Sequence, residues 1–147
     1  MTLQRRSALV QAIAAMALLC VCTPSVDAAE RLFFRMGGEA KLRAAVDELV
    51  NVILNDERIN FAFAAADLSR FKQQLYTQLC ELAAGPCIYD GRDMQTAHAK
   101  LPLTDAHFNA LTEDLYIAFD RVGIAYPLQN EMVALLAPMQ RQIVRKR

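Results

Sequence analysis

Residues 67–100 read DLSRFKQQLYTQLCELAAGPCIYDGRDMQTAHAK and are the most informative part of this chain. The segment begins at Asp67, a residue type that caps helix N-termini well, and then repeats apolar side chains at the spacing of one helical face. The pattern stops at Gly85-Pro86, which ends a helix, and a long loop leads to His98. Because a long loop in a small domain usually serves a functional site, we expect a site between this helix and His98. The apolar positions of the helix are Leu68, Phe71, Leu75, Leu79 and Leu82.

Helical periodicity continues before this stretch. Residues 39–55 place apolar side chains at i, i+3, i+4, i+7, i+8, i+11 and i+12, which predicts an amphipathic helix. Residues 30–36 form a helical or irregular lead-in, which Gly37-Gly38 should end. Residues 56–60 should make a tight turn. The sequence shows no strand-like alternation, and we therefore predict an all-α fold.

Two further helices are expected after His98. Thr104 should cap one that ends at Val122, with Gly123 as its stop. The last helix should cover residues 128–144, and Pro138 should kink it or divide it into two shorter helices. The side chains predicted to face inward are Phe108, Leu111, Leu115, Phe119 and Val122 in the first of these helices, and Met132, Leu135, Leu136, Met139 and Ile143 in the second.

The first 28 residues differ in kind from the rest. A basic head, an apolar run over residues 7–22 and a small polar tail ending in Val26-Asp27-Ala28 are typical of a secretory signal peptide. We predict cleavage after Ala28, a mature domain of residues 29–147 and a periplasmic location. The alternative is an uncleaved membrane anchor, but the apolar run is shorter than the roughly 20 residues that span a bilayer.

Charge and composition argue against nucleic acid as a partner. The chain has 147 residues, of which 54% are hydrophobic and 22% charged, as expected for one domain with a buried core. Its formal net charge of +0 argues against nucleic acid binding. The basic residues near the C-terminus are interpreted as complementing a helix dipole.

Two of the four cysteines, Cys80 and Cys87, lie beyond the predicted leader. Together with His98 they do not match the paired spacing of a zinc site, and a fourth ligand is missing. In an oxidising compartment the two cysteines could form a disulfide across the junction between helix and loop. Two buried free thiols are an equally good interpretation of the sequence.

Three blocks of sequence carry a resemblance to a known family: DERINFAFAAADLSRFK, QLCELAAGPCIYDGRDMQTAH and LTDAHFNAL. They resemble the group I truncated haemoglobins, the short two-on-two helical globins, over nearly all of residues 32–144. The resemblance implies a two-on-two helical sandwich around haem b. It also implies reversible binding of oxygen and other diatomic ligands, such as nitric oxide and carbon monoxide.

The resemblance changes the interpretation of His98, one of 2 histidines. A lone histidine on a helix is more often a satisfied polar side chain than a ligand. His98, however, ends the GRDM-x-x-AH block and matches the proximal histidine, which binds haem iron through Nε2. His107 resembles a histidine that is frequent at the start of the next helix, and we do not expect it to be a ligand.

The resemblance also implies a set of haem contacts. Cations or phenols at the haem edge can meet the propionates, although surface charge is an equal interpretation for Lys72. Ordinary core packing is the alternative for each apolar position. The expected wall residues are Phe63, Phe71, Leu75, Met94, Ala97, Leu103, Phe108 and Leu111, and the expected propionate partners are Arg70, Lys72 and Tyr89.

The chain departs from the family pattern on the expected ligand side. Well-studied members hold oxygen with a tyrosine and a glutamine, whereas Val50 and Leu75 stand at the matching positions here. We therefore expect an apolar pocket with weak oxygen retention, unless Gln74 or Gln78 supplies the missing donor. Ala84 replaces a frequent glycine, which suggests a loop that needs less freedom there or adopts another turn.

Three classes of function remain at this point. The leading hypothesis is a haem b globin that binds diatomic ligands. The enzymatic alternatives are nitric-oxide dioxygenation, which would need an electron donor or reductase as partner, and peroxidase-like chemistry; the apolar pocket counts against both. The third hypothesis is a helical interaction module without a cofactor.

Overall fold

The computed structural model describes residues 31–144, and within that range every regular element is a helix, as predicted. Among these residues no helix is long and apolar enough to cross a membrane. The predicted leader lies outside the described range. The elements are α1 (Leu32–Arg35), α2 (Gly38–Asn55), the 3-10 helix η2 (Asn60–Phe63), α3 (Leu68–Leu82), α4 (Met94–His98), α5 (Asp105–Arg121), α6 (Tyr126–Leu136), the 3-10 helix η3 (Ala137–Met139) and α7 (Gln140–Ile143).

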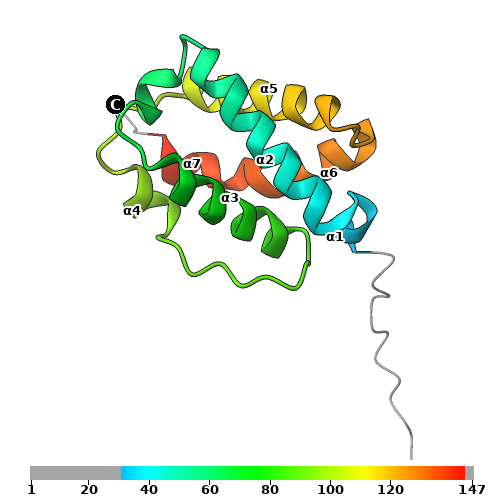
Figure 1. Ribbon diagram of the computed structural model, residues 1–147. Coiled ribbons are helices and arrows are strands. Elements are labelled where there is room, and N and C mark those ends of the chain that lie inside the picture. The colour runs from blue at the N-terminus through cyan, green and yellow to red at the C-terminus, as the bar shows by residue number, and fades with distance from the viewer. Residues whose placement is uncertain (1–30, 145–147) are drawn as a thin grey trace, which may run out of the picture.

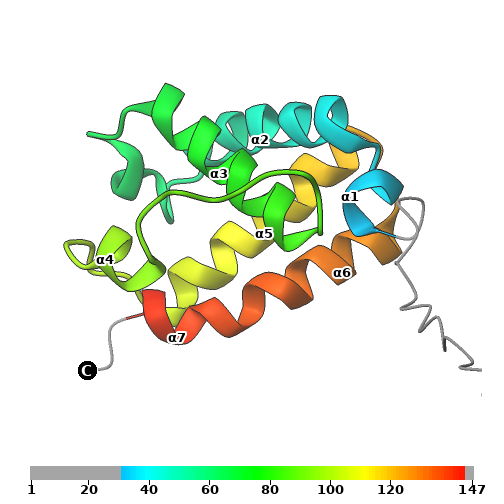
Figure 2. The same cartoon turned by 90° about the horizontal axis from the view of Figure 1, so that it is seen from below.

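The long helices form two layers, with α2 and α3 stacked over α5 and α6 (Figure 2). Helix α2 is the central element because it contacts both α3 in its own layer and α5 in the other. The loop that follows α3 runs back beside that helix toward α4 in both views (Figures 1 and 2). The short helix α4 lies next to α7 at the same end of the molecule.

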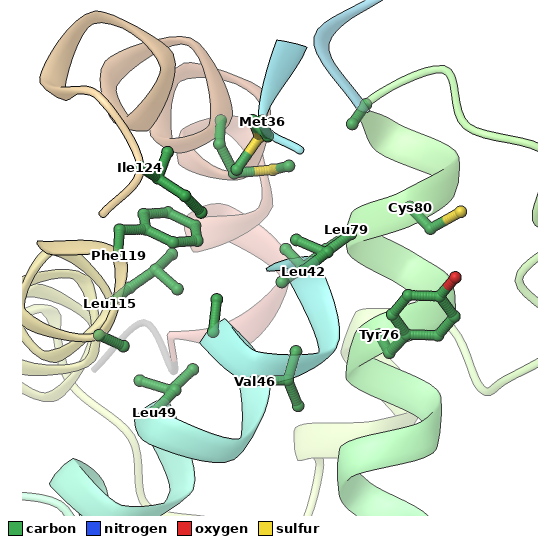
Figure 3. Packing of buried hydrophobic residues seen from close by; sticks show 14 of the residues in the cluster. Met36, Leu42, Val46, Leu49, Tyr76, Leu79, Cys80, Leu115, Phe119 and Ile124 are labelled. Atoms are coloured by element: carbon green, nitrogen blue, oxygen red, sulfur yellow. The ribbon is translucent and has the colours of Figure 1, made fainter. Parts of the chain in front are cut away.

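The core fills the space between the layers. Leu115 and Phe119 of α5 point toward Leu42 and Leu49 of α2, as Figure 3 shows. Phe119 is 0% exposed. Full burial of an apolar side chain of this size contributes about 1.5–3 kcal/mol, so this seam between α2 and α5 is a principal source of stability.

The predicted inner face of the C-terminal segment is only partly correct. Met132 is fully buried, but Leu135 is 39% exposed. Helix α6 turns Met132 and Leu136 inward, four residues apart, which leaves Leu135 on the flank. Pro138 divides the segment as predicted, because the residues around it form the 3-10 helix η3 between α6 and α7.

Helix starts agree closely with the sequence-based expectations. The Asp67 side chain accepts a hydrogen bond from Arg70 N at 3.0 Å and caps α3. Thr104 and His107 form a capping box at the start of α5, in which Thr104 N donates to His107 Nδ1 at 3.2 Å. Helix α6 begins at Tyr126, two residues before the predicted start at residue 128, because Pro127 is well accommodated in a first turn.

Positive φ angles mark the turn before α2 and the turn after α3, among others. Gly37 and Gly38 have φ values of 99° and 69°, in accord with the predicted break before α2. Ala84 has a φ of 58°, in the left-handed region that glycine favours. Of the two expectations for Ala84, the one that the loop needs less freedom there is therefore wrong. The alanine bears the steric cost of this conformation.

A cluster of charged residues joins the end of α2 to α5. Arg58 pairs with Asp56 at 2.7 Å and with Glu113 at 2.6 Å, and it lies 3.9 Å from the buried carboxylate of Asp114. Burial raises the pKa of Asp114 to about 6, and the negative charge of Asp56 acts in the same direction. Hydrogen bonds from Arg58 lower the pKa of Asp56. Asp114 therefore loses its proton at a higher pH than Asp56 does.

This cluster predicts that the difference in stability between Asp114→Asn and wild type depends on pH. Since the folded-state pKa of Asp114 is raised, protonation stabilises the fold, and that contribution is lost as pH rises through about 6. An asparagine keeps the neutral form at every pH. We expect the variant to match wild type near pH 4 and to be more stable at pH 8 by about 1–3 kcal/mol, as measured by urea unfolding. An equal stability difference at both pH values would contradict this assignment.

Candidate functional site

A cavity of about 620 Å³ lies between α3, the loop after it, α4, α5 and the C-terminal segment. Its volume is in the range of small-molecule and cofactor sites, and most of its wall is apolar. The structure brings all of the principal residues predicted from the sequence onto this wall. They are Phe63, Arg70, Phe71, Leu75, Tyr89, Met94, His98, Leu103 and Phe108.

His98 is the side chain on this wall best suited to hold a metal centre. Its Nδ1 lies 2.7 Å from the backbone oxygen of Met94. A carbonyl oxygen only accepts hydrogen bonds, so Nδ1 carries the proton of the neutral ring. The lone pair of Nε2 is then available to a metal, and the Met94 carbonyl fixes the orientation of the ring.

The helix that carries His98 is short and depends on its cap. Helix α4 has only 5 residues, Met94–His98, and a helix of this length does not persist alone. Asp93 accepts hydrogen bonds from Thr96 N at 2.8 Å and from Thr96 Oγ1 at 2.7 Å. These bonds lower the pKa of Asp93 and hold the first turn of α4 in place.

The mouth of the cavity combines basic groups with a phenol. Arg70 of α3 and Arg92 of the loop both line it, and neither guanidinium pairs with a carboxylate within residues 31–144. Tyr89 donates a hydrogen bond from its hydroxyl to the Arg92 oxygen at 2.8 Å. Burial raises the pKa of Tyr89, with the carboxylates of Asp90 and Asp93 adding to it. The mouth can therefore receive carboxylates.

The wall formed by α3 combines apolar and polar side chains. Phe71 and Leu75 face the cavity, and the Phe71 ring packs against Phe63 with centroids 5.1 Å apart. Val50 was expected to face the cavity but does not line it; it is 2% exposed and lies in the core, while its neighbour Leu49 lines the cavity. Successive helical residues are about 100° apart, so Leu49 and Val50 point in clearly different directions from α2.

Gln74 is the polar side chain of α3 with an unmet hydrogen-bonding need. Its Oε1 is buried and has no partner among the described residues. Its Nε2 lies 3.5 Å from Asp90 Oδ1, at the limit of a hydrogen bond. A Cβ at Gly91 would overlap Gln74 Oε1 and the Tyr89 ring, so the loop packs closely over Gln74. Gln74 thus borders the cavity but is turned toward its mouth.

Gln78 connects the two sides of the cavity. Its Nε2 lies 3.2 Å from Met94 Sδ of α4 and 3.6 Å from Met139 Sδ of η3. Thioether sulfur is a weak acceptor, so these contacts position the side chains more than they stabilise them. Helical spacing alone did not show this link, because it depends on how α4 packs against α3.

Other predicted and unpredicted residues complete the site. His107 lines the cavity, but its Nδ1 is engaged by Thr104 N. Lys72, weighed as a propionate partner, pairs instead with Asp47 at 2.8 Å and does not line the cavity. Arg92 was not predicted, although its place in the GRDM-x-x-AH block could have suggested it. Further wall residues that the sequence did not indicate include Ile59, Leu101 and Thr112.

Comparison with known proteins identifies the class. Residues 31–145 match the family model of bacterial-like globins, and the chain belongs to this family. The chain is 27% identical over 117 residues to the group 1 truncated haemoglobin of Tetrahymena pyriformis, covering 80% of this chain and 97% of that protein. It is 32% identical over 108 residues to that of Synechocystis sp., covering 71% of this chain and 87% of that protein.

Solved structures agree with this assignment. The ferric truncated haemoglobin of Tetrahymena pyriformis matches with a TM-score of 0.75 at 28% identity, over 78% of this chain and 98% of that chain. The cyanomet two-on-two haemoglobin of Synechococcus sp., with covalently attached haem, matches with a TM-score of 0.70 at 29% identity, over 76% and 94% respectively. The chain thus has the group I, two-on-two globin fold. It is a haem-binding protein whose ligands are small diatomic molecules.

Proposed function

We propose that this chain is an exported haem b globin that binds and quickly releases oxygen, with His98 as the iron ligand. The observation that carries the proposal is the hydrogen bond from His98 Nδ1 to the Met94 oxygen at 2.7 Å, at the wall of the cavity of about 620 Å³. It leaves Nε2 as the ligating atom and sets its direction.

The cavity fits this cofactor in shape and chemistry. The apolar part of its wall would cover the porphyrin. Arg70, Arg92 and Tyr89 at the mouth would meet the two propionates by charge-assisted hydrogen bonds. Haem iron, when bound, supplies the open coordination position at which a diatomic ligand binds.

Quick release follows from the apolar side chains that α3 presents to the cavity. Leu75 and Phe71 offer no donor, and a hydrogen bond to a polarised ligand contributes about 0.5–1.5 kcal/mol. Gln74 is the competing donor, since a side-chain rotation away from Asp90 would bring its amide inward. Carbon monoxide is less polarised than oxygen and should respond less to either side chain.

The enzymatic alternatives have weaker support. Nitric-oxide dioxygenation requires retained oxygen and an electron donor or reductase, and the apolar wall disfavours the first requirement. Peroxidase chemistry requires an acid/base residue opposite His98. The side chains of α3 that line the cavity from Phe71 onward are Phe71, Gln74, Leu75, Gln78 and Leu79, and none of them is titratable.

A direct experiment tests the proposed function. Titration of the purified protein with hemin should give one Soret-absorbing haem per chain, and the ferrous form should bind oxygen and carbon monoxide reversibly. A protein that gains no Soret band would instead support the helical interaction module. A bound haem that reacts with nitric oxide and a reductase in repeated turnovers would favour the dioxygenase.

Export to the periplasm is proposed from the predicted leader, which is outside the described residues. A disulfide between Cys80 and Cys87 supports an oxidising compartment. We expect the mature protein to begin at Ala29, and intact-mass measurement of periplasmic material should find that mass. Material that retains Met1 would contradict cleavage and favour the membrane-anchored alternative.

A further inference from the structure

The loop after α3 is tied to that helix by a disulfide between Cys80 and Cys87, whose Cα atoms are 5.7 Å apart. Figure 3 shows the Cys80 sulfur directed away from α2, on the outer side of α3. Of the two alternatives that the sequence left open, the structure contains the disulfide. It joins the helix to the loop segment that forms part of the cavity wall, since Tyr89, Gly91 and Arg92 follow Cys87 within a few residues.

Few hydrogen bonds within residues 31–144 attach this part of the loop to the helices. The bond from Gly85 N to the Cys80 oxygen, 2.7 Å long, fixes only its start. The bond from the Tyr89 hydroxyl to Arg92 lies within the loop and does not attach it to the helices. Beyond these, Cys87 Sγ lies 3.6 Å from the Tyr76 hydroxyl and Gln74 lies 3.5 Å from Asp90, both at or beyond the usual limits of a strong bond. The disulfide is therefore the strongest tether of the wall segment.

The two sulfurs differ in access. Cys80 is 0% exposed, whereas Cys87 is partly exposed and its neighbour Ile88 is 81% exposed. A thiolate from outside can approach Cys87 but not Cys80. This asymmetry defines which sulfur is attacked and which one leaves.

We propose that Cys87 is a thiol–disulfide exchange site for a dithiol, and that its redox state sets how firmly the loop closes the cavity. One thiolate of the dithiol attacks Cys87 Sγ, and Cys80 Sγ departs as a thiolate that takes up a proton. The second thiol then attacks the mixed disulfide and releases Cys87. Two electrons pass to the protein, the dithiol becomes a disulfide, and a disulfide oxidant reverses the reaction.

Opening the disulfide removes the tether from the segment that carries Tyr89 and Arg92. The wall then opens more often, and haem is lost faster at the mouth where these residues lie. Loss of the tether also frees Gln74 from its packing against Gly91. The effect on haem retention rests on the proposed function, whereas the exchange reaction and the loop opening do not.

Hydrogen exchange on the haem-loaded protein tests the loop directly, with dithiothreitol as the dithiol. We expect dithiothreitol to reduce the folded protein and the hydrogen-bonded amides of Ala84 and Gly85, at the start of the loop, to exchange on the order of tenfold faster, while those of α5 stay unchanged. Cys87→Ser should exchange like the reduced protein and should not respond to dithiothreitol. A disulfide that resists dithiothreitol until the protein unfolds, or a loop that exchanges equally in both states, would overturn the proposal.

Haem transfer to apomyoglobin provides the second readout. After removal of dithiothreitol under argon, the reduced protein and Cys87→Ser should lose haem on the order of tenfold faster than the oxidised protein. Equal transfer rates would overturn the claimed effect on the cavity. A loop that opens on reduction in a protein that never holds haem would support the exchange site and refute the proposed function instead.

Discussion

The His98→Ala variant is expected to lose nearly all of its haem on purification. His98 Nε2 is the one imidazole nitrogen on the described cavity wall that the hydrogen-bond pattern leaves ready for a metal and also orients. Mutation of residues that only support a metal ligand costs 10–100-fold in affinity, so removal of the ligand itself should cost at least about 100-fold. Haem content per chain, from the pyridine haemochrome spectrum, measures the loss.

His107→Gln is the matched control for this variant. It also removes an imidazole from the cavity wall, but glutamine at this position can still accept from Thr104 N and keep the capping box of α5. We expect normal haem content and an unchanged ferrous spectrum. Equal haem loss in the two variants would show that the cavity needs both imidazoles and would refute the assignment of His98 alone.

The second large effect is expected for oxygen release from Leu75→Gln. Leu75 faces the cavity from α3, and a glutamine there would place an amide donor at a position where Leu75 presents only methyl groups. A new hydrogen bond of about 1.4 kcal/mol would slow release tenfold, and stopped-flow displacement of oxygen measures it. Carbon monoxide release should change much less. Leu75→Met, which fills similar volume without a donor, is the control.

Gln74 supplies the competing explanation and has its own variant. If Gln74 already donates to the ligand, Gln74→Leu should speed oxygen release and Leu75→Gln should have little effect. Slow release from wild type that persists in Gln74→Leu would count against both Gln74 as donor and the apolar wall. Gln78 or an ordered water would then be the next donor to test.

The helices could be predicted because their signals are local. Apolar spacing, the Asp67 cap and the breaks at Gly37 and Pro138 each act within a few residues, and the structure confirms them. His98 was also accessible from sequence, but only because the surrounding block resembles a family. On its own, a single histidine is compatible with many environments.

The features that could not be predicted depend on tertiary packing. Val50 lies behind the wall because the rotation of α2 directs Leu49 to the cavity instead. Two cysteines seven positions apart, Cys80 and Cys87, could bond only if the loop folded back over α3, which periodicity does not report. Ala84 adopts a left-handed conformation that alanine disfavours, which its residue type does not predict.

Resonance Raman spectroscopy of the ferrous protein tests the central claim, that His98 ligates the haem iron through Nε2, most directly. Wild type should show an iron–imidazole stretching band, His98→Gly should lack it, and added imidazole should restore it in His98→Gly by occupying the vacated site. His107→Gln should keep the band of wild type. An iron–imidazole band that survives in His98→Gly without added imidazole would contradict the account.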